Sequence, residues 1–232
     1  MRINSIVRRM GQFTVPNPPY GDMRLNVMPF EHSLKRQKLP PCFEAWEGAF
    51  NKLLRFIPLR KGANQHYLTI DSKFFPMEET LRRPGIHLDG NFCVDPTFKN
   101  KTWGGTTGTW LNTAYDPVFT VVKDWELPYD IEFPVGDYVS DTKGGILCVA
   151  SEVGCQAWQG HFEGDVGDGG DLATMSSQFT PDRRILLNAN TLYFMTSNAP
   201  HETLPVAKGK RRTLLRITLN HEYPNELILK AG

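Results

Sequence analysis

The segment HETLPVAKGKRRTLLRITL, residues 201–219, decides the fold class. Two runs rich in β-branched and other apolar residues flank a polar turn that contains Gly209. Such runs, bounded by turn residues, are typical of β-strands. The same pattern recurs along the chain in YLTID (67–71), GIHLDGNF (85–92), FTVVKDW (119–125), GGILCVAS (144–151), ILLNA (185–189) and TLYFMTS (191–197).

One helix is predicted near the N-terminus, over residues 41–57. Pro41 suits the first turn of a helix, where a backbone N–H has no partner within the helix. The apolar residues that follow recur at helical spacing and form one stripe. They are Phe43, Trp46, Phe50, Leu53, Leu54 and Ile57. This stripe needs an apolar surface to cover, and the predicted strands supply a sheet for it.

The composition favours one β-rich domain that spans residues 1–232. The 20 glycines and 17 prolines indicate short elements joined by turns. The Pro-rich residues 1–41 are expected to form an irregular arm on the domain surface. Residues 95–142 are expected to form a long insertion, whose Trp103, Trp110 and Trp125 would build a lid or a substrate wall.

Charge, apolar runs and cysteines restrict the partners and the compartment. Lysine and arginine number 26 against 25 acidic residues, and the resulting net charge of +1 disfavours nucleic acid as a partner. No segment approaches the roughly 20 apolar residues of a membrane span. The four cysteines have neither CxxC nor zinc-type spacing. A cytoplasmic protein with free thiols and no membrane partner is predicted.

Three side chains form a candidate metal site. His87 and Asp89 are two residues apart, so on an extended strand both point to the same face. His201 begins a later strand-like segment. If that segment lies beside the first, two imidazoles and one carboxylate converge. Such a set leaves one side of a metal open, as in non-haem Fe(II) oxygenases.

These features resemble the Fe(II)/2-oxoglutarate-dependent dioxygenases over residues 84–91 and 169–219. His87-x-Asp89 resembles the metal-binding HxD of that family, and Gly169-Gly170-Asp171-Leu172 resembles the glycine–glycine–acid–leucine stretch of a middle strand. His201 resembles the distal histidine. The resemblance implies a mainly β fold, a double-stranded β-helix (jelly-roll) barrel, with an N-terminal supporting helix and a long insertion.

In that family a basic residue on the strand after the distal histidine binds the far carboxylate of 2-oxoglutarate. Arginine suits this role because its planar guanidinium can donate two charge-assisted hydrogen bonds to a carboxylate. Arg211 and Thr213 would share one strand face, and Arg212 and Arg216 the opposite face. The sequence does not fix which face points inward, so all four residues stay candidates.

The resemblance implies an oxidoreductase that binds Fe(II) through His87, Asp89 and His201 and uses 2-oxoglutarate as cosubstrate. The enzyme would consume O₂ and hydroxylate, or otherwise oxidise, a small-molecule or peptide substrate that the sequence does not identify. Tyr67 and Tyr193 are the candidates for an additional contact to 2-oxoglutarate.

Other interpretations stay open. Gly160-His161-Phe162-Glu163 contains a second histidine–acid pair at i, i+2, although a turn histidine explains it more simply. A cupin-like metalloenzyme with the same barrel would bind a metal without 2-oxoglutarate. In a non-catalytic jelly-roll binding or structural protein, His87 and His201 would have no metal role.

Overall fold

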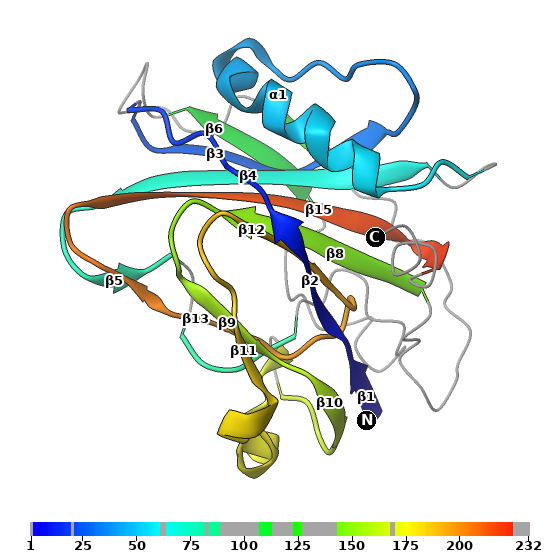
Figure 1. Ribbon diagram of the computed structural model, residues 1–232, viewed down its shortest axis with the longest axis vertical. Helices are drawn as coiled ribbons and strands as arrows, with labels where there is room; N and C mark the ends of the chain where they lie inside the picture. The colour runs from blue at the N-terminus through cyan, green and yellow to red at the C-terminus, as the bar shows by residue number, and fades with distance from the viewer. Residues whose placement is uncertain are drawn as a thin grey trace.

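The computed structural model is mainly antiparallel β structure with little helix, as the sequence predicts (Figure 1). It describes residues 2–19, 21–60, 64–81, 84–88, 107–112, 123–126, 143–167 and 170–224. The strands are β1 (Arg2–Ser5), β2 (Val7–Gln12), β3 (Met23–Glu31), β4 (Gln65–Phe75), β5 (Glu79–Thr80), β6 (Thr107–Asn112), β7 (Lys123–Glu126), β8 (Lys143–Ala150), β9 (Cys155–Trp158), β10 (Gly160–Glu163), β11 (Arg184–Leu186), β12 (Thr191–Met195), β13 (His201–Thr203), β14 (Pro205–Val206) and β15 (Lys210–Pro224). The α-helix is α1 (Glu44–Leu53), and the short 3₁₀ helices are η1 (Pro41–Phe43), η2 (Leu54–Phe56), η6 (Ala173–Gln178) and η7 (Pro181–Arg183).

The strands form one large sheet and several small ones. The large sheet has the order β2-β12-β8-β15-β4-β3-β6-β7, and every neighbouring pair is antiparallel. A three-stranded sheet has the order β11-β9-β13, and the pairs β1-β10 and β14-β5 stand apart from it. Within the described ranges these sheets are separate, and their hydrogen bonding does not close into a barrel.

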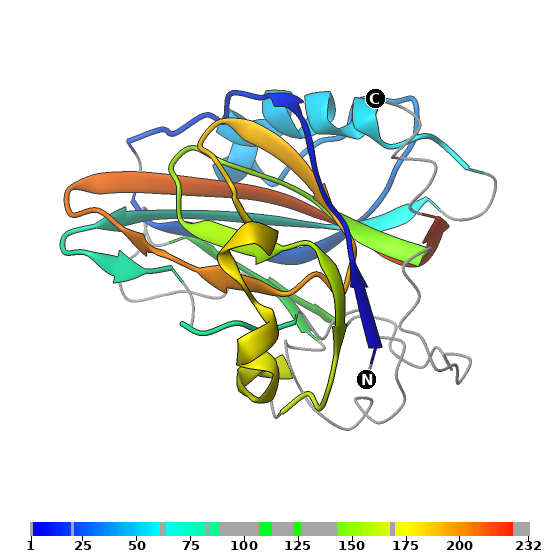
Figure 2. The ribbon, with the colours of Figure 1, turned by 60° about the horizontal axis from the view of Figure 1, so that its bottom comes forward.

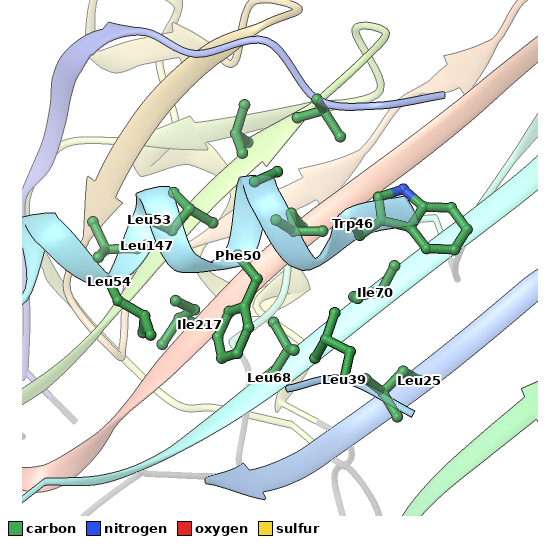
Figure 3. Close-up of a cluster of buried hydrophobic side chains, with 14 of the residues drawn as sticks. Leu25, Leu39, Trp46, Phe50, Leu53, Leu54, Leu68, Ile70, Leu147 and Ile217 are labelled. Atoms are coloured by element: carbon green, nitrogen blue, oxygen red, sulfur yellow. The ribbon is translucent and has the colours of Figure 1, made fainter. Parts of the chain in front are cut away.

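Helix α1 lies on one face of the large sheet, and the three-stranded sheet lies on the other (Figures 1 and 2). The helix begins where Pro41 opens the short turn η1, as the sequence predicts. All six residues of the predicted apolar stripe, residues 43–57, are buried. Figure 3 shows Trp46, Phe50 and Leu53 pointing from the helix toward the sheet. The helix therefore covers the apolar face of the sheet, which is the role predicted for it.

The large sheet presents alternate residues to its two faces, as the period of a β-strand requires. On β4, Leu68 and Ile70 belong to the core beneath the helix. On β15, Leu215 and Ile217 do the same. The residues between them therefore face the three-stranded sheet. In each of these strands, alternate side chains therefore form the core beneath the helix, and the side chains between them form the opposite face of the sheet.

The expectation of an irregular arm over residues 1–41 is wrong for most of that segment. β1 pairs with β10, β2 forms an edge of the large sheet beside β12, and β3 lies between β4 and β6. The strands escaped prediction because β2 has few buried side chains and because β3 contains Pro29 and a register shift between Leu25 and Met28. Strand pairing at a distance, not local propensity, organises this segment.

The predicted insertion, residues 95–142, lies largely outside the described residues. Its two described stretches are the strands β6 and β7, which extend the large sheet beyond β3. The proposed role of this insertion as a lid or substrate wall stays a prediction. In the described part of the chain, no helix is long and apolar enough to cross a membrane.

Phe50→Ala tests the contact between the helix and the sheet. Phe50 is 0% exposed, and its ring meets that of Phe30 edge to face, with centroids 4.9 Å apart. Truncating a buried phenylalanine leaves a cavity, so we expect the free energy of unfolding to fall by about 3–5 kcal/mol in chemical denaturation. Leu34→Ala is the control, because Leu34 is 93% exposed. Equal stabilities of the two variants would contradict this packing.

A second prediction concerns His66, which is buried in β4 with its ring 5.9 Å from that of Phe30. Burial, and to a smaller extent the neighbouring His32, lowers the pKa of His66 from 6.5 to about 3. Between these values the unfolded chain binds a proton that the folded chain does not. Stability is therefore complete above pH 6.5 and falls as the pH is lowered, by up to about 1.4 kcal/mol per pH unit.

His66→Gln should accordingly make the pH dependence of unfolding shallower between pH 6 and pH 4, measured by urea denaturation at a series of pH values. His161→Gln provides the control, because His161 is exposed on β10 and should keep the wild-type slope. A His66→Gln variant with an unchanged slope would show that His66 does not carry this proton linkage.

Candidate functional site

His87 and His201 lie side by side, although 113 residues lie between them in the sequence. The two residues form an isolated antiparallel bridge. The His87 N–H donates to the His201 carbonyl at 2.9 Å, and the His201 N–H donates to the His87 carbonyl at 3.1 Å. Their ring centroids are 4.5 Å apart. The structure therefore brings together the two imidazoles of the predicted metal site.

Each imidazole is held at its Nδ1 atom by a backbone carbonyl group two residues upstream. His87 Nδ1 lies 2.8 Å from the Gly85 carbonyl oxygen, and His201 Nδ1 lies 2.9 Å from the Ala199 carbonyl oxygen. A carbonyl oxygen can only accept a hydrogen bond, so in each ring Nδ1 carries the proton. In the neutral ring this leaves a lone pair on Nε2. Metal-binding histidines are commonly fixed in this way by a carbonyl on the other ring nitrogen.

Residues 170–172 support the backbone on either side of His87. The Leu88 N–H donates to the Gly170 carbonyl at 2.9 Å, and the Leu172 N–H donates to the Ile86 carbonyl at 3.0 Å. Gly170 has a φ of +78°, and a Cβ at this position would lie 2.5 Å from the Leu88 carbonyl oxygen. Only glycine fits at position 170 without a clash. This explains the second glycine of the Gly169-Gly170-Asp171-Leu172 stretch.

A cavity lies between the large sheet and the three-stranded sheet, and both histidines line it. Its volume is about 80 Å³, which is room for several water molecules. The large sheet contributes Ile146, Cys148 and Tyr193 to the walls, and the smaller sheet contributes Cys155 and Thr203. The site is thus a partly open and largely apolar pocket with a few polar groups, which is the usual form of a small-molecule site.

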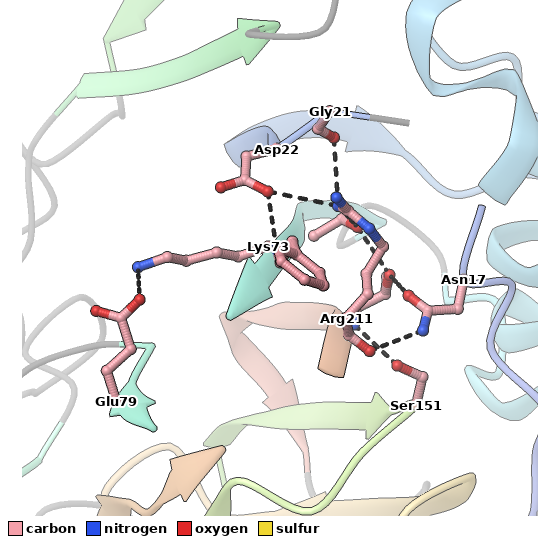
Figure 4. Close-up of polar contacts among 10 residues, drawn as sticks. Asn17, Gly21, Asp22, Lys73, Glu79, Ser151 and Arg211 are labelled. Carbon is pink, nitrogen blue, oxygen red and sulfur yellow. Dashed lines mark hydrogen bonds and ion pairs between the residues drawn. The ribbon is translucent and has the colours of Figure 1, made fainter. Parts of the chain in front are cut away.

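The register of β15 separates the four cosubstrate candidates into two pairs. Arg212 and Arg216 line the cavity with the histidines. Arg211 and Thr213 point to the opposite face of the sheet. There Arg211 Nη1 lies 3.3 Å from the Gly21 carbonyl oxygen and 3.5 Å from an Asp22 carboxylate oxygen (Figure 4). The Thr213 hydroxyl donates to Asn17 Oδ1 at 2.9 Å.

Arg211 and Thr213 are therefore removed from the list of cosubstrate candidates. Side chains alternate between the two faces of a strand. Arg212 and Arg216 are on the face that lines the cavity with the histidines, so Arg211 and Thr213 are on the other face. Arg212 is 3% exposed, and its Nε donates to the Glu152 carbonyl at 3.3 Å. Arg216 Nε donates to the Thr218 hydroxyl at 3.2 Å. Both guanidinium groups are thus oriented by neighbouring groups of the protein.

The third predicted ligand, Asp89, lies outside the described residues. Among the described residues, no group of three histidine, cysteine, aspartate or glutamate side chains could hold a metal ion. His87 and His201 supply two of the three predicted donors. Asp171, which bridges to His87 through its backbone, is exposed and accepts the Ala173 N–H at 2.8 Å. Its carboxylate therefore stabilises its own turn.

The second histidine–acid pair, His161 and Glu163, lies away from this cavity. Both side chains are exposed on β10. Glu163 accepts from Arg2 Nε at 3.2 Å, across the β1-β10 pair. These residues line neither the cavity nor the histidine pair. His161 therefore lies on an exposed strand and not in a turn, and its position gives no support for a metal site.

The sequence had not assigned Cys148 or Cys155 to the site. Both nevertheless line the cavity. Their position follows from strand alternation, since Ile146 and Cys148 on β8 share one face. Tyr193 also lines the cavity, and its hydroxyl donates to the Leu186 carbonyl at 3.3 Å.

Comparisons of the chain with protein-family models, with curated proteins and with solved structures gave no match. The chemistry of the site therefore rests on its own geometry.

Gly170→Ala tests the support of the His87 segment. The new methyl group would meet the Leu88 carbonyl oxygen, and the positive φ adds a cost of about 1–2 kcal/mol. Gly209→Ala is the matched control, because Gly209 has a φ of +76° with nothing within 4 Å of its Cβ position. We expect Gly170→Ala to lower the free energy of unfolding clearly more than Gly209→Ala does. Equal losses would mean that residue 170 does not press against the histidine segment.

Proposed function

We propose that this protein is an Fe(II)- and 2-oxoglutarate-dependent oxygenase. The observation that carries the proposal is the pair of imidazoles at His87 and His201. Nδ1 of each ring is held by a backbone carbonyl oxygen, and both histidines line the cavity that Arg212 and Arg216 also line. Two histidines fit a metal, and an arginine in the same pocket fits the carboxylate of an organic acid.

The order of the strands supports a jelly roll as the fold behind this site. From β4 onward, the chain moves from the large sheet to the His87 segment beside β13, returns to the large sheet as β6, β7 and β8, and crosses again as β9. After β10, which pairs with β1, it continues in the smaller sheet as β11, the large sheet as β12, the smaller sheet as β13 and the large sheet as β15. Repeated crossing between two facing sheets is the connection pattern of a double-sheet jelly roll.

His87, His201 and Asp89 would hold Fe(II). The carbonyl contact at Nδ1 of each imidazole fits the tautomer whose Nε2 can bind a metal, and Asp89, two positions after His87, would add an anionic oxygen donor. When bound, Fe(II) supplies the redox chemistry that couples O₂ to the decarboxylation of 2-oxoglutarate and to oxidation of the substrate.

The remaining side chains would bind, orient and exclude water. Arg212 is buried at the end of the cavity beside Gly154, where its guanidinium would hold the far carboxylate of 2-oxoglutarate. Ile146, Met195 and Leu214 line the cavity with apolar surface. Such walls keep bulk water from a reactive centre. A cupin-like metalloenzyme without 2-oxoglutarate would have no need of the buried arginine.

Anaerobic titration of the purified protein with Fe(II) and then 2-oxoglutarate tests the proposal. Chelation of the metal by 2-oxoglutarate should produce a weak visible charge-transfer band, and air should then yield succinate. His201→Ala and Asp89→Ala should lose both the band and succinate formation, because each removes one ligand. His161→Ala should behave as wild type.

The outcomes separate the competing functions. A metal that binds at the histidines without a band and without succinate would favour the cupin-like enzyme. Wild-type protein that binds no Fe(II), or a His201→Ala variant that forms succinate at the wild-type rate, would contradict the proposal.

A further inference from the structure

We infer that a basic groove on the helix side of the large sheet binds an acidic segment of another protein that also carries leucine side chains. The groove lies between residues 32–36, which follow β3, and the solvent-exposed side of α1 and η2. Its volume is about 740 Å³, and clefts of this size hold ligands. The histidine cavity lies on the other face of the sheet (Figure 1), so the inference is independent of the proposed function.

The side chains that line the groove give it a positive charge. Lys35, Arg36, Lys52 and Arg55 line it, and none of the other described lining residues is acidic. Arg36 Nη2 lies 3.0 Å from a carboxylate oxygen of Glu47, so this charge is matched within the protein. The other three cations form no ion pair within the described part of the chain. Because the whole chain has a net charge of only +1, positive charge is concentrated here.

Hydrogen bonds between the loop and the helix form the groove before any partner arrives. The Gln37 N–H donates to Asn51 Oδ1 at 2.8 Å, and Asn51 Nδ2 donates to the Gln37 carbonyl at 2.9 Å. The ion pair of Arg36 is a further link between the two walls. Lys52 Nζ lies 5.0 Å from the centroid of the Phe13 ring, a contact that orients the lysine without neutralising it. A partner can therefore bind without the entropic cost of ordering the loop.

Two exposed leucines add an apolar component to the groove. Leu34 is 93% exposed and Leu59 is 41% exposed, and both line the groove. Covering such side chains with apolar groups of a partner is favourable, because it removes them from water. Clusters of basic side chains recognise acidic motifs in proteins. Leucines beside cations therefore match a peptide in which leucine or a similar side chain stands next to aspartate or glutamate.

The same lining residues make a poor site for nucleic acid. Grooves that bind single strands combine positive charge with aromatic side chains on which the bases stack. Among the described lining residues the one aromatic ring is the imidazole of His32, and this residue is only 6% exposed. The exposed apolar surface comes instead from leucine, which gives a base no ring to stack on. An acidic peptide is therefore the better match to the groove.

The test measures the binding of short fluorescent peptides to the whole chain by anisotropy at low ionic strength. Leucines in the peptides are separated by one, two or three glutamates, and a matched set has glutamine in place of glutamate. At least one glutamate peptide should bind about tenfold or more tightly than its glutamine counterpart, because three weak exposed charge pairs act together. Added salt should weaken this binding, because it screens exposed charges.

Substitutions in the groove test where the peptide binds. The triple variant Lys35→Gln, Lys52→Gln and Arg55→Gln should weaken binding of the best glutamate peptide by about tenfold or more. Leu34→Ala should weaken it by about threefold or more, because it removes apolar surface that the peptide covers.

A matched control removes three exposed cations that do not line the groove. This variant carries Arg184→Gln, Lys208→Gln and Lys210→Gln. It changes the net charge as much as the groove variant does, yet it should keep the peptide affinity within about threefold, because distant exposed charges are largely screened. Urea denaturation of both triple variants should show that they are folded.

Four results would overturn the inference: no glutamate peptide is preferred over its glutamine counterpart, the control variant loses as much affinity as the groove variant, Leu34→Ala binds as wild type does, or single-stranded oligouridylate binds more tightly than the best peptide. The last result would assign the groove to nucleic acid. None of these results depends on Fe(II) or 2-oxoglutarate, so the proposed function and this inference stand or fall separately.

Discussion

The short antiparallel bridge between His87 and His201 is the contact on which the site depends. Two backbone hydrogen bonds join these residues, and a carbonyl two positions upstream of each fixes its ring. The bridge joins a segment after β5 to a strand near the C-terminal end of the chain. Without this bridge nothing would hold the two imidazoles next to each other, and the cavity would lack the two histidines of the proposed metal site.

Strand β15 connects that site to the hydrophobic core. Its odd positions, such as Leu215 and Ile217, lie in the core beneath helix α1, while Arg212 and Arg216 line the cavity on the other face. Burial of the odd positions therefore fixes where the arginines point. A shift of one residue would send the arginines into the core and remove them from the cavity, so the stability of the core and the geometry of the site are coupled.

The sequence predicted what local pattern controls. The stripe from Phe43 to Ile57 identified the helix, and the β-branched runs identified β4, β8, β11, β12, β13 and β15. The sequence does not reveal pairing between distant strands. It predicts an irregular arm where β1 to β3 form, and it gives no signal for β9 and β10. The choice between Arg211 and Arg212 depended on which face of β15 meets the helix, and no local property of Arg-Arg-Thr encodes that.

The most direct measurement of the central claim is the number of imidazoles on a bound metal. One equivalent of Cu(II) serves as the spin probe in protein that carries His161→Ala, which removes an exposed histidine, and electron spin-echo envelope modulation detects the remote ring nitrogens. The account predicts two coordinated imidazoles in this protein and one after the further change His87→Ala or His201→Ala. A spectrum with fewer than two imidazoles, or one that neither change alters, would contradict it.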